Sequence, residues 1–105
     1  MNTLEKRLRA DAEAILRASI GAVKPDSAVR RALEGARFPG RVFLVAAGKA
    51  AWQMASVARE TLPALAGGVV VTKYGHVKGE IADVACYEGG HPVPDENSLR
   101  GTASA

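Results

Sequence analysis

Three short segments of this sequence combine glycine with lysine, histidine or carboxylate side chains, which are residue types that bind anions and move protons. The first segment holds Gly48-Lys49, the second holds Lys73 and His76, and the third holds His91 and Asp95. Glycine lets a backbone approach an anion closely, and a neighbouring lysine adds a mobile positive charge. These residues indicate a site for a phosphate or carboxylate group. For Gly48-Lys49 the simpler alternative is a tight turn with a solvated lysine.

The common nucleotide-binding motifs do not match this region. A Walker A loop needs a glycine five residues before Gly48 and a hydroxyl residue after Lys49, but the sequence has Phe43 and Ala50 there. A dinucleotide-binding turn has three glycines, and residues 46–51 contain one. Lys73 stands where an acidic residue would hold a ribose. Because a lysine can contact a 2′-phosphate, an NADP-linked enzyme stays open as an alternative.

The two histidines do not have the spacing of a metal site. His76 and His91, with Glu80 and Glu88 nearby, match no zinc pattern, so we expect no metal ion held by these residues. Loop histidines are commonly solvated or hydrogen-bonded to the backbone. Asp95 also has a second interpretation, because an aspartate at the start of a helix caps its free N–H groups.

Alternating helix and strand patterns predict the elements that position these residues. Helical spacing of apolar residues covers residues 3–20 and ends at Gly21; a turn at 24–27 precedes a second, short helix. Strands are predicted over residues 42–46, 69–72 and, more weakly, 81–87. A helix between the first two strands carries the apolar stripe Ala51, Met54, Ala55, Ala58 and Leu62, and is followed by breakers at Pro63 and Gly67-Gly68.

This order of elements predicts an α/β fold with a mainly parallel sheet. The unbroken apolar strand at residues 42–46 is typical of a strand that is buried on both faces. The carboxyl ends of parallel strands are where such sheets bind ligands, and all three segments follow predicted strands. Three strands make a thin sheet, and residues 101–105 bring no apolar stripe to a helix after Asp95. We therefore expect the opening part of a larger Rossmann-like, three-layer domain, able to self-associate through an uncovered sheet edge.

Composition narrows the function classes. The chain has 105 residues, 48% hydrophobic and 24% charged, which is enough for one domain with a modest core. The net charge of +3 comes from dispersed basic residues with few aromatics, so we expect no nucleic-acid partner. No apolar run is long enough to cross a membrane. The single cysteine, Cys86, favours a reducing compartment, and we expect a cytoplasmic protein.

Taken together, the three segments resemble the glycerate 2-kinase family of the type that carries a C-terminal MOFRL domain. The resemblance rests on residues 45–51 (VAAGKAA), 70–76 (VVTKYGH) and 88–96 (EGGHPVPDE), the last being the most specific. It extends from the first helix to Arg100. One departure is Ala46, which replaces the first glycine of the family's Gly-x-Gly-Lys turn.

The resemblance implies transfer of a phosphoryl group from ATP, with Mg²⁺, to the 2-hydroxyl of D-glycerate. It implies that Lys49 is a catalytic residue, and that Gly48, Lys73, His76, His91 and Asp95 are candidates for binding substrate or nucleotide. Family members are several times longer, and members have often been labelled hydroxypyruvate reductases. We therefore expect residues 1–105 to be the N-terminal segment of the kinase domain and to be inactive alone. An NADP-linked hydroxypyruvate reductase and a small non-enzymatic α/β binding module stay as alternatives.

Overall fold

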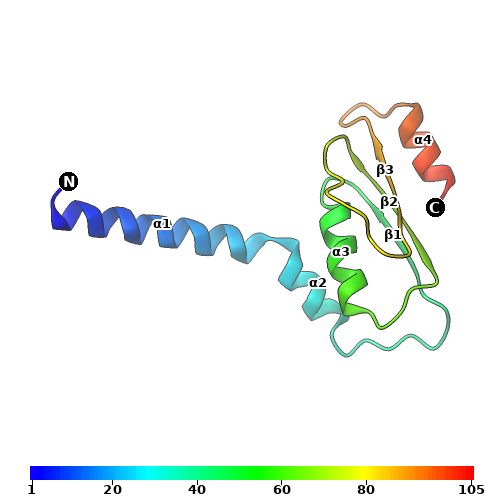
Figure 1. Cartoon of the computed structure of the whole chain (residues 1–105), viewed down its shortest axis with the longest axis horizontal. Helices are drawn as coiled ribbons and strands as arrows, with labels where there is room; N and C mark the ends of the chain where they lie inside the picture. The colour runs from blue at the N-terminus through cyan, green and yellow to red at the C-terminus, as the bar shows by residue number, and fades with distance from the viewer.

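A three-stranded parallel sheet is the centre of the fold. The computed structural model describes all 105 residues. In chain order the elements are α1 (Thr3–Val23), α2 (Pro25–Leu33), β1 (Phe43–Ala47), α3 (Ala51–Thr61), β2 (Gly67–Lys73), β3 (Ala85–Gly89) and α4 (Glu96–Ala103). The strands lie in the order β1-β2-β3, all parallel (Figure 1). The predicted α/β class and parallel sheet are confirmed.

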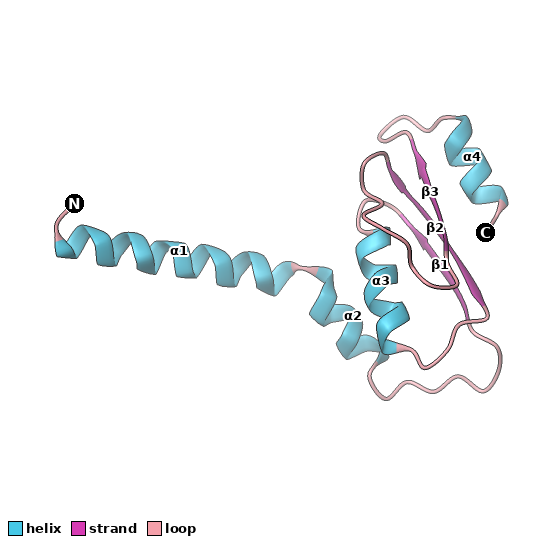
Figure 2. Ribbon diagram, viewed as in Figure 1, coloured by secondary structure: helices cyan, strands magenta, loops and turns pink.

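Helices cover the two faces of the sheet in a three-layer arrangement (Figure 2). Alternate residues of a strand point to opposite faces. On one face Val70 is fully buried in a cluster with Ala51 and Ala55 of α3. On the other face Val71 lies against Gly101 of α4. Ala51 and Ala55 belong to the predicted apolar stripe of α3, and their small side chains let this helix pack closely on the sheet.

Several predicted boundaries are wrong for identifiable reasons. Helix α1 continues through Gly21 and ends at Val23, because a glycine weakens a helix without ending it. Pro25 is not part of a turn before α2 but is the first residue of that helix, a position that proline favours. Gly67-Gly68 opens β2 instead of lying before it. Strand β3 is displaced toward the C-terminus of the predicted range, because Ile81 pairs with Val84 in a local antiparallel bridge.

Strand β1 is not buried on both faces in this chain. Leu44 and Ala46 pack toward α3, but Phe43 is 60% exposed and Val45 is 63% exposed. The reason is that α4 contacts β2 and β3 and leaves the neighbouring part of that face uncovered. The prediction of a doubly buried strand is therefore wrong for these 105 residues.

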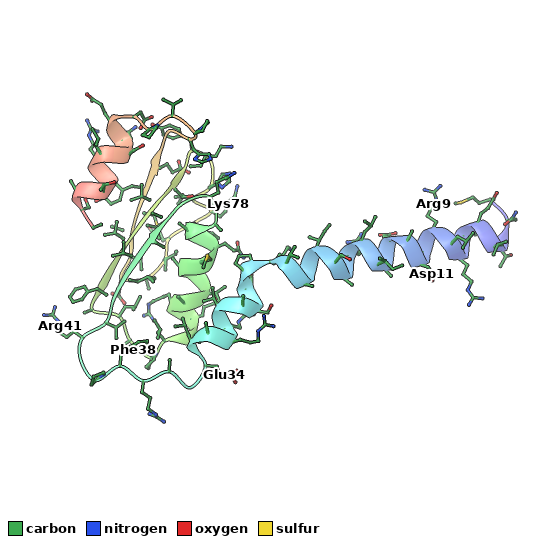
Figure 3. The ribbon with its side chains drawn as sticks, turned by 180° about the vertical axis from the view of Figure 1, so that it is seen from behind. Arg9, Asp11, Glu34, Phe38, Arg41 and Lys78 are labelled. Atoms are coloured by element: carbon green, nitrogen blue, oxygen red, sulfur yellow. The ribbon has the colours of Figure 1, made fainter.

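Helix α1 projects away from the sheet and buries none of its residues (Figures 1 and 3). A capping box fixes its start, because the Asn2 side chain accepts from the Glu5 N–H and the Glu5 carboxylate accepts from the Asn2 N–H. Its apolar side chains, among them Leu8 and Ile15, stay more than half exposed. No helix of this fold combines the length and the apolar character that a membrane crossing requires.

Candidate active site

The three segments predicted to act together meet at the carboxyl ends of the strands. A hollow of about 190 Å³ lies there between the turn after β1, the end of β2 and the loop after β3. Its lining includes the sequence-predicted residues Gly48, Lys49, Lys73 and His91, together with Thr72, Gly89, Gly90, Pro94 and Ser98. His76 and Asp95 do not line this hollow. Each is hydrogen-bonded to a residue that does: His76 to Lys49, and Asp95 to Ser98. The placement is the one expected for a ligand site of an open α/β sheet.

The Gly48-Lys49 turn is held against β2 by backbone and side-chain hydrogen bonds. Gly48 has φ 116°, a left-handed conformation that favours glycine. Its N–H donates to the Val71 carbonyl at 3.0 Å, and its carbonyl accepts from the buried Thr72 hydroxyl at 2.8 Å. Helix α3 begins just after this turn, and no side chain caps its first N–H groups. The turn therefore presents a lysine beside backbone donors, which is an arrangement suited to an anion.

Gly89, the last residue of β3, and Gly90, the first residue of the following loop, have no room for a side chain. A Cβ at Gly89 would lie 2.6 Å from the Ser98 hydroxyl oxygen and 2.9 Å from the Ser98 nitrogen. A Cβ at Gly90 would collide with the Val93 carbonyl oxygen and lie 3.1 Å from the Asp95 carboxylate. The same loop carries His91, which lines the hollow.

Asp95 is an anchor of this loop. The sequence-predicted N-cap is confirmed: Asp95 Oδ1 accepts from the Ser98 N–H at 3.1 Å, and the Ser98 hydroxyl in turn accepts from the Asp95 N–H. Asp95 Oδ2 accepts from the Tyr74 hydroxyl at 2.6 Å. The Tyr74 hydrogen bond, assisted by the N–H groups of Gly90 and Ser98, lowers the pKa of Asp95 to about 2. A carboxylate so engaged is a poor proton acceptor and has little capacity left for a ligand.

Replacing Tyr74 by phenylalanine is expected to raise the pKa of Asp95 from about 2 toward its ordinary value of 3.8. A carboxyl group whose pKa is lowered by folding stabilises the fold above its unfolded pKa, and this stabilisation is lost as the pH falls through the folded value. The Tyr74→Phe variant should thus lose order in the loop of residues 90–95 at a higher pH than the unmodified protein.

A carbon-13 NMR titration of the Asp95 carboxyl measures this shift directly. Tyr87→Phe is the matched control, since the Tyr87 hydroxyl bonds to Ser104 at 3.0 Å and not to Asp95. An Asp95 titration midpoint that is the same in Tyr74→Phe and in the unmodified protein would contradict the assignment of Tyr74 as its main partner.

His76 contacts the backbone of the first segment. Its Nδ1 lies 3.1 Å from the Lys49 carbonyl oxygen. The same loop is tied to β3, because the Val77 N–H donates to the Glu88 carboxylate at 3.0 Å. No three His, Cys, Asp or Glu side chains gather in this chain in a way that could hold a metal ion.

Thr72, Tyr74, Ser98 and the Gly89-Gly90 pair are the site residues that sequence reasoning missed. Two signals were available. Thr72 is a hydroxyl residue at the end of an otherwise apolar strand, and Tyr74 stands between two residues already considered as ligands. The partners of these hydroxyl groups come from distant parts of the chain, so their roles become visible only in the fold.

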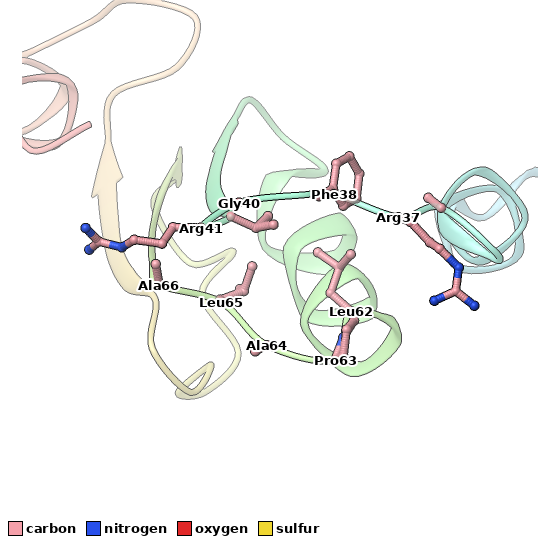
Figure 4. A pocket seen from close by; sticks show the side chains of 11 residues that line it. Arg37, Phe38, Gly40, Arg41, Leu62, Pro63, Ala64, Leu65 and Ala66 are labelled. Carbon is pink, nitrogen blue, oxygen red and sulfur yellow. The ribbon is translucent and has the colours of Figure 1, made fainter.

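A larger hollow lies at the opposite end of the sheet. It has a volume of about 430 Å³, and apolar side chains such as Phe38, Leu62 and Leu65 surround it (Figure 4). Arg37 and Arg41 are its charged residues. This hollow precedes β1 and β2, at the amino ends of the strands, where open α/β sheets do not ordinarily bind ligands. We therefore assign the candidate site to the smaller, polar hollow around Lys49.

This sequence is similar to a known protein family and to glycerate 2-kinases. Residues 11–105 match the family described as "Domain of unknown function (DUF4147)". The D-glycerate 2-kinase of Thermotoga maritima is 54% identical over 89 residues, which are 84% of this chain and 21% of that protein. The glycerate 2-kinase of Pyrococcus horikoshii is 44% identical over 66 residues, covering 63% of this chain and 14% of the relative.

Comparison with solved structures also finds a glycerate kinase of Thermotoga maritima. The crystal structure of the Thermotoga maritima glycerate kinase superposes with a TM-score of 0.84 at 50% identity, over 94% of this chain and 24% of that one. The chain thus spans about a fifth to a quarter of the length of the relatives from this organism. The matched fold and the matched residues together show that the chain belongs to the DUF4147 family, the family of the glycerate 2-kinases.

Proposed function

We propose that this chain forms part of the active site of a glycerate 2-kinase, which converts D-glycerate and ATP to 2-phosphoglycerate and ADP. The observation that carries the proposal is the Gly48-Lys49 turn, which shares its hollow with Lys73 and His91. Two kinases with 54% and 44% identity to this chain support the choice of glycerate as the substrate. ATP is the proposed phosphoryl donor.

Phosphoryl transfer is catalysed mainly by positioning of the reactants and by positive charge near the transferred group. The oxygen of the 2-hydroxyl group bonds to the γ-phosphorus while the bond from that phosphorus to the β,γ-bridging oxygen breaks, and the hydroxyl proton leaves to a base. Charge builds up on the phosphoryl oxygens, and a lysine that contacts them stabilises the transition state. We assign this role to Lys49, with Lys73 and His91 as further contacts to the anionic substrates.

We propose that the Mg²⁺ ion takes its protein ligands from outside these 105 residues. No cluster of His, Cys, Asp or Glu could hold the ion, and the Asp95 carboxylate is already hydrogen-bonded to Tyr74 and Ser98. Magnesium in kinases is commonly held by substrate phosphates and one or two carboxylates. We therefore propose that Mg²⁺ arrives with ATP and that its carboxylate ligands lie outside these 105 residues.

The length of the relatives bears on where activity resides. This chain matches 21% of the Thermotoga maritima enzyme, and its sheet has three strands. Kinases need a closed site that excludes water from the reacting phosphate. We propose that activity requires a protein of the relatives' length and that residues 1–105 alone do not catalyse the reaction.

Phosphorus-31 NMR of the reaction mixture tests the proposal. The protein in its native length, given ATP, Mg²⁺ and D-glycerate, should form 2-phosphoglycerate, and the isolated 105-residue chain should form none above background. Parallel incubation with hydroxypyruvate and NADPH tests the reductase alternative. Oxidation of NADPH without any phosphorylated product from glycerate would overturn the kinase proposal.

A further inference from the structure

The His76 side chain contacts the backbone of the residue proposed to stabilise the transferred phosphoryl group. Its Nδ1 lies 3.1 Å from the Lys49 carbonyl oxygen, and 27 positions separate the two residues in the chain. The contact joins the loop after β2 to the turn after β1. His76 itself does not line the hollow around Lys49. Its most direct effect is therefore on the position of Lys49.

The partner atom determines which ring nitrogen carries the proton. A carbonyl oxygen can only accept a hydrogen bond, so Nδ1 of His76 must be the donor. This donor is present in the neutral Nδ1–H tautomer and also in the charged ring. The bond therefore requires a proton at Nδ1, and leaves Nε2 without a part in holding the turn.

A side chain at the end of β2 holds the carbonyl of the preceding residue, Gly48. The Thr72 hydroxyl, 4% exposed as a residue, donates to the Gly48 carbonyl oxygen at 2.8 Å. Two consecutive carbonyls of the turn are thus fixed by donors from the end of β2 and the loop that follows it. Fixing both carbonyls orients the two peptide units that set the direction of the Lys49 side chain.

We propose that His76 is a positioning residue that aims Lys49 at the transferred phosphoryl group through its Nδ1–H bond to the Lys49 carbonyl. The inference rests on the proposed kinase function. It differs from the expectation that His76 binds substrate or nucleotide, because it gives the ring a backbone partner and no contact with a ligand. Small displacements of a catalytic group slow the chemical step more than they weaken substrate binding.

Substitution of His76 by asparagine or by glutamine distinguishes a role of Nδ1 from a role of Nε2. In Asn the amide nitrogen lies next to Cγ, as Nδ1 does in histidine, whereas in Gln it lies one atom further out, near the place of Nε2. His76→Asn should therefore keep the bond to Lys49, and His76→Gln should lose it. In the protein of native length we expect His76→Gln and His76→Ala to lower kcat about 10- to 100-fold with KM changed less than about twofold. His76→Asn should stay within about threefold of the unmodified enzyme.

Other patterns of activity overturn the proposal. Full activity in His76→Gln with loss in His76→Asn would assign the function to Nε2. Equal activity in all variants would show that Lys49 needs no such contact, and equal loss in all of them would show that the ring itself is required. A rise in KM at constant kcat would make His76 a ligand-binding residue. If His76→Ala does not fold, the Asn and Gln variants still decide the matter, since both retain a polar side chain.

Nitrogen-15 NMR of the histidine rings provides a readout that does not depend on kinase activity. The ring signals that disappear in His76→Asn belong to His76, and their shifts show whether Nδ1 carries the proton. A proton on Nε2 alone would overturn the inference. Failure of the unmodified protein to phosphorylate glycerate would instead refute the proposed function, and the ring signals would still show whether His76 holds the Lys49 carbonyl.

Discussion

Replacing Lys49 by alanine is expected to lower kcat for glycerate phosphorylation about 1,000-fold in the protein of native length. Lys49 lies at the turn between β1 and α3 and lines the polar hollow at the carboxyl edge of the sheet. Its ammonium group would neutralise charge that develops on the phosphoryl oxygens in the transition state. Initial rates of ADP formation measure the loss.

Controls separate the charge of Lys49 from its contribution to folding. Lys49→Arg keeps the charge but alters its reach and geometry, so we expect it to recover only part of the activity. Lys6→Ala removes an exposed lysine from the projecting helix α1 and should leave kcat unchanged. Thermal unfolding should occur at similar temperatures in all three variants. A loss smaller than about tenfold in Lys49→Ala would remove this residue from the proposed mechanism.

Replacing Gly90 by alanine is expected to lower kcat about 100-fold, although the change adds one methyl group. The new Cβ would collide with the Val93 carbonyl oxygen and approach the Asp95 carboxylate to 3.1 Å. Both are parts of the same stiff loop, so the loop must shift and carry His91 away from the hollow. We also expect a lower unfolding temperature, because the cap of α4 depends on Asp95.

Gly79→Ala is the matched control for the Gly90 variant. No atom lies within 4 Å of a Cβ at Gly79, and its backbone needs no left-handed conformation. This variant should keep both the activity and the unfolding temperature of the unmodified protein. Activity measurements and thermal unfolding on the two alanine variants complete the comparison. Equal behaviour of Gly90→Ala and Gly79→Ala would contradict the tight packing of this loop.

The sequence pattern predicted the parallel sheet well because its signals are local. The apolar runs around Val45 and Val70 and the alanine stripe of α3 each lie within one element. The wrong predictions concern burial and strand boundaries that depend on contacts outside the element itself. Phe43 is exposed because no helix reaches that part of the sheet face, and Ile81 leaves the expected strand to pair with Val84. Helix α4 forms without an apolar stripe because Asp95 caps it and Gly101 fits against Val71.

The candidate site was predictable in its location but not in the roles of its members. Gly48, Lys49, Lys73 and His91 line the hollow because parallel strands end at one edge. Asp95 and His76 instead hold backbone and neighbouring side chains. Their partners lie 21 and 27 positions away, at Tyr74 and Lys49, and no local pattern in the sequence indicates which polar residue will meet which.

The most direct test of this account is a crystal structure of the protein in its native length with Mg²⁺, a non-hydrolysable ATP analogue and D-glycerate. We predict that the terminal phosphate lies at the carboxyl edge of the sheet, within hydrogen-bond distance of Lys49 Nζ, and that the 2-hydroxyl of glycerate lies beside it. Phosphates bound elsewhere, for example between Arg37 and Arg41 at the opposite end of the strands, would contradict the account.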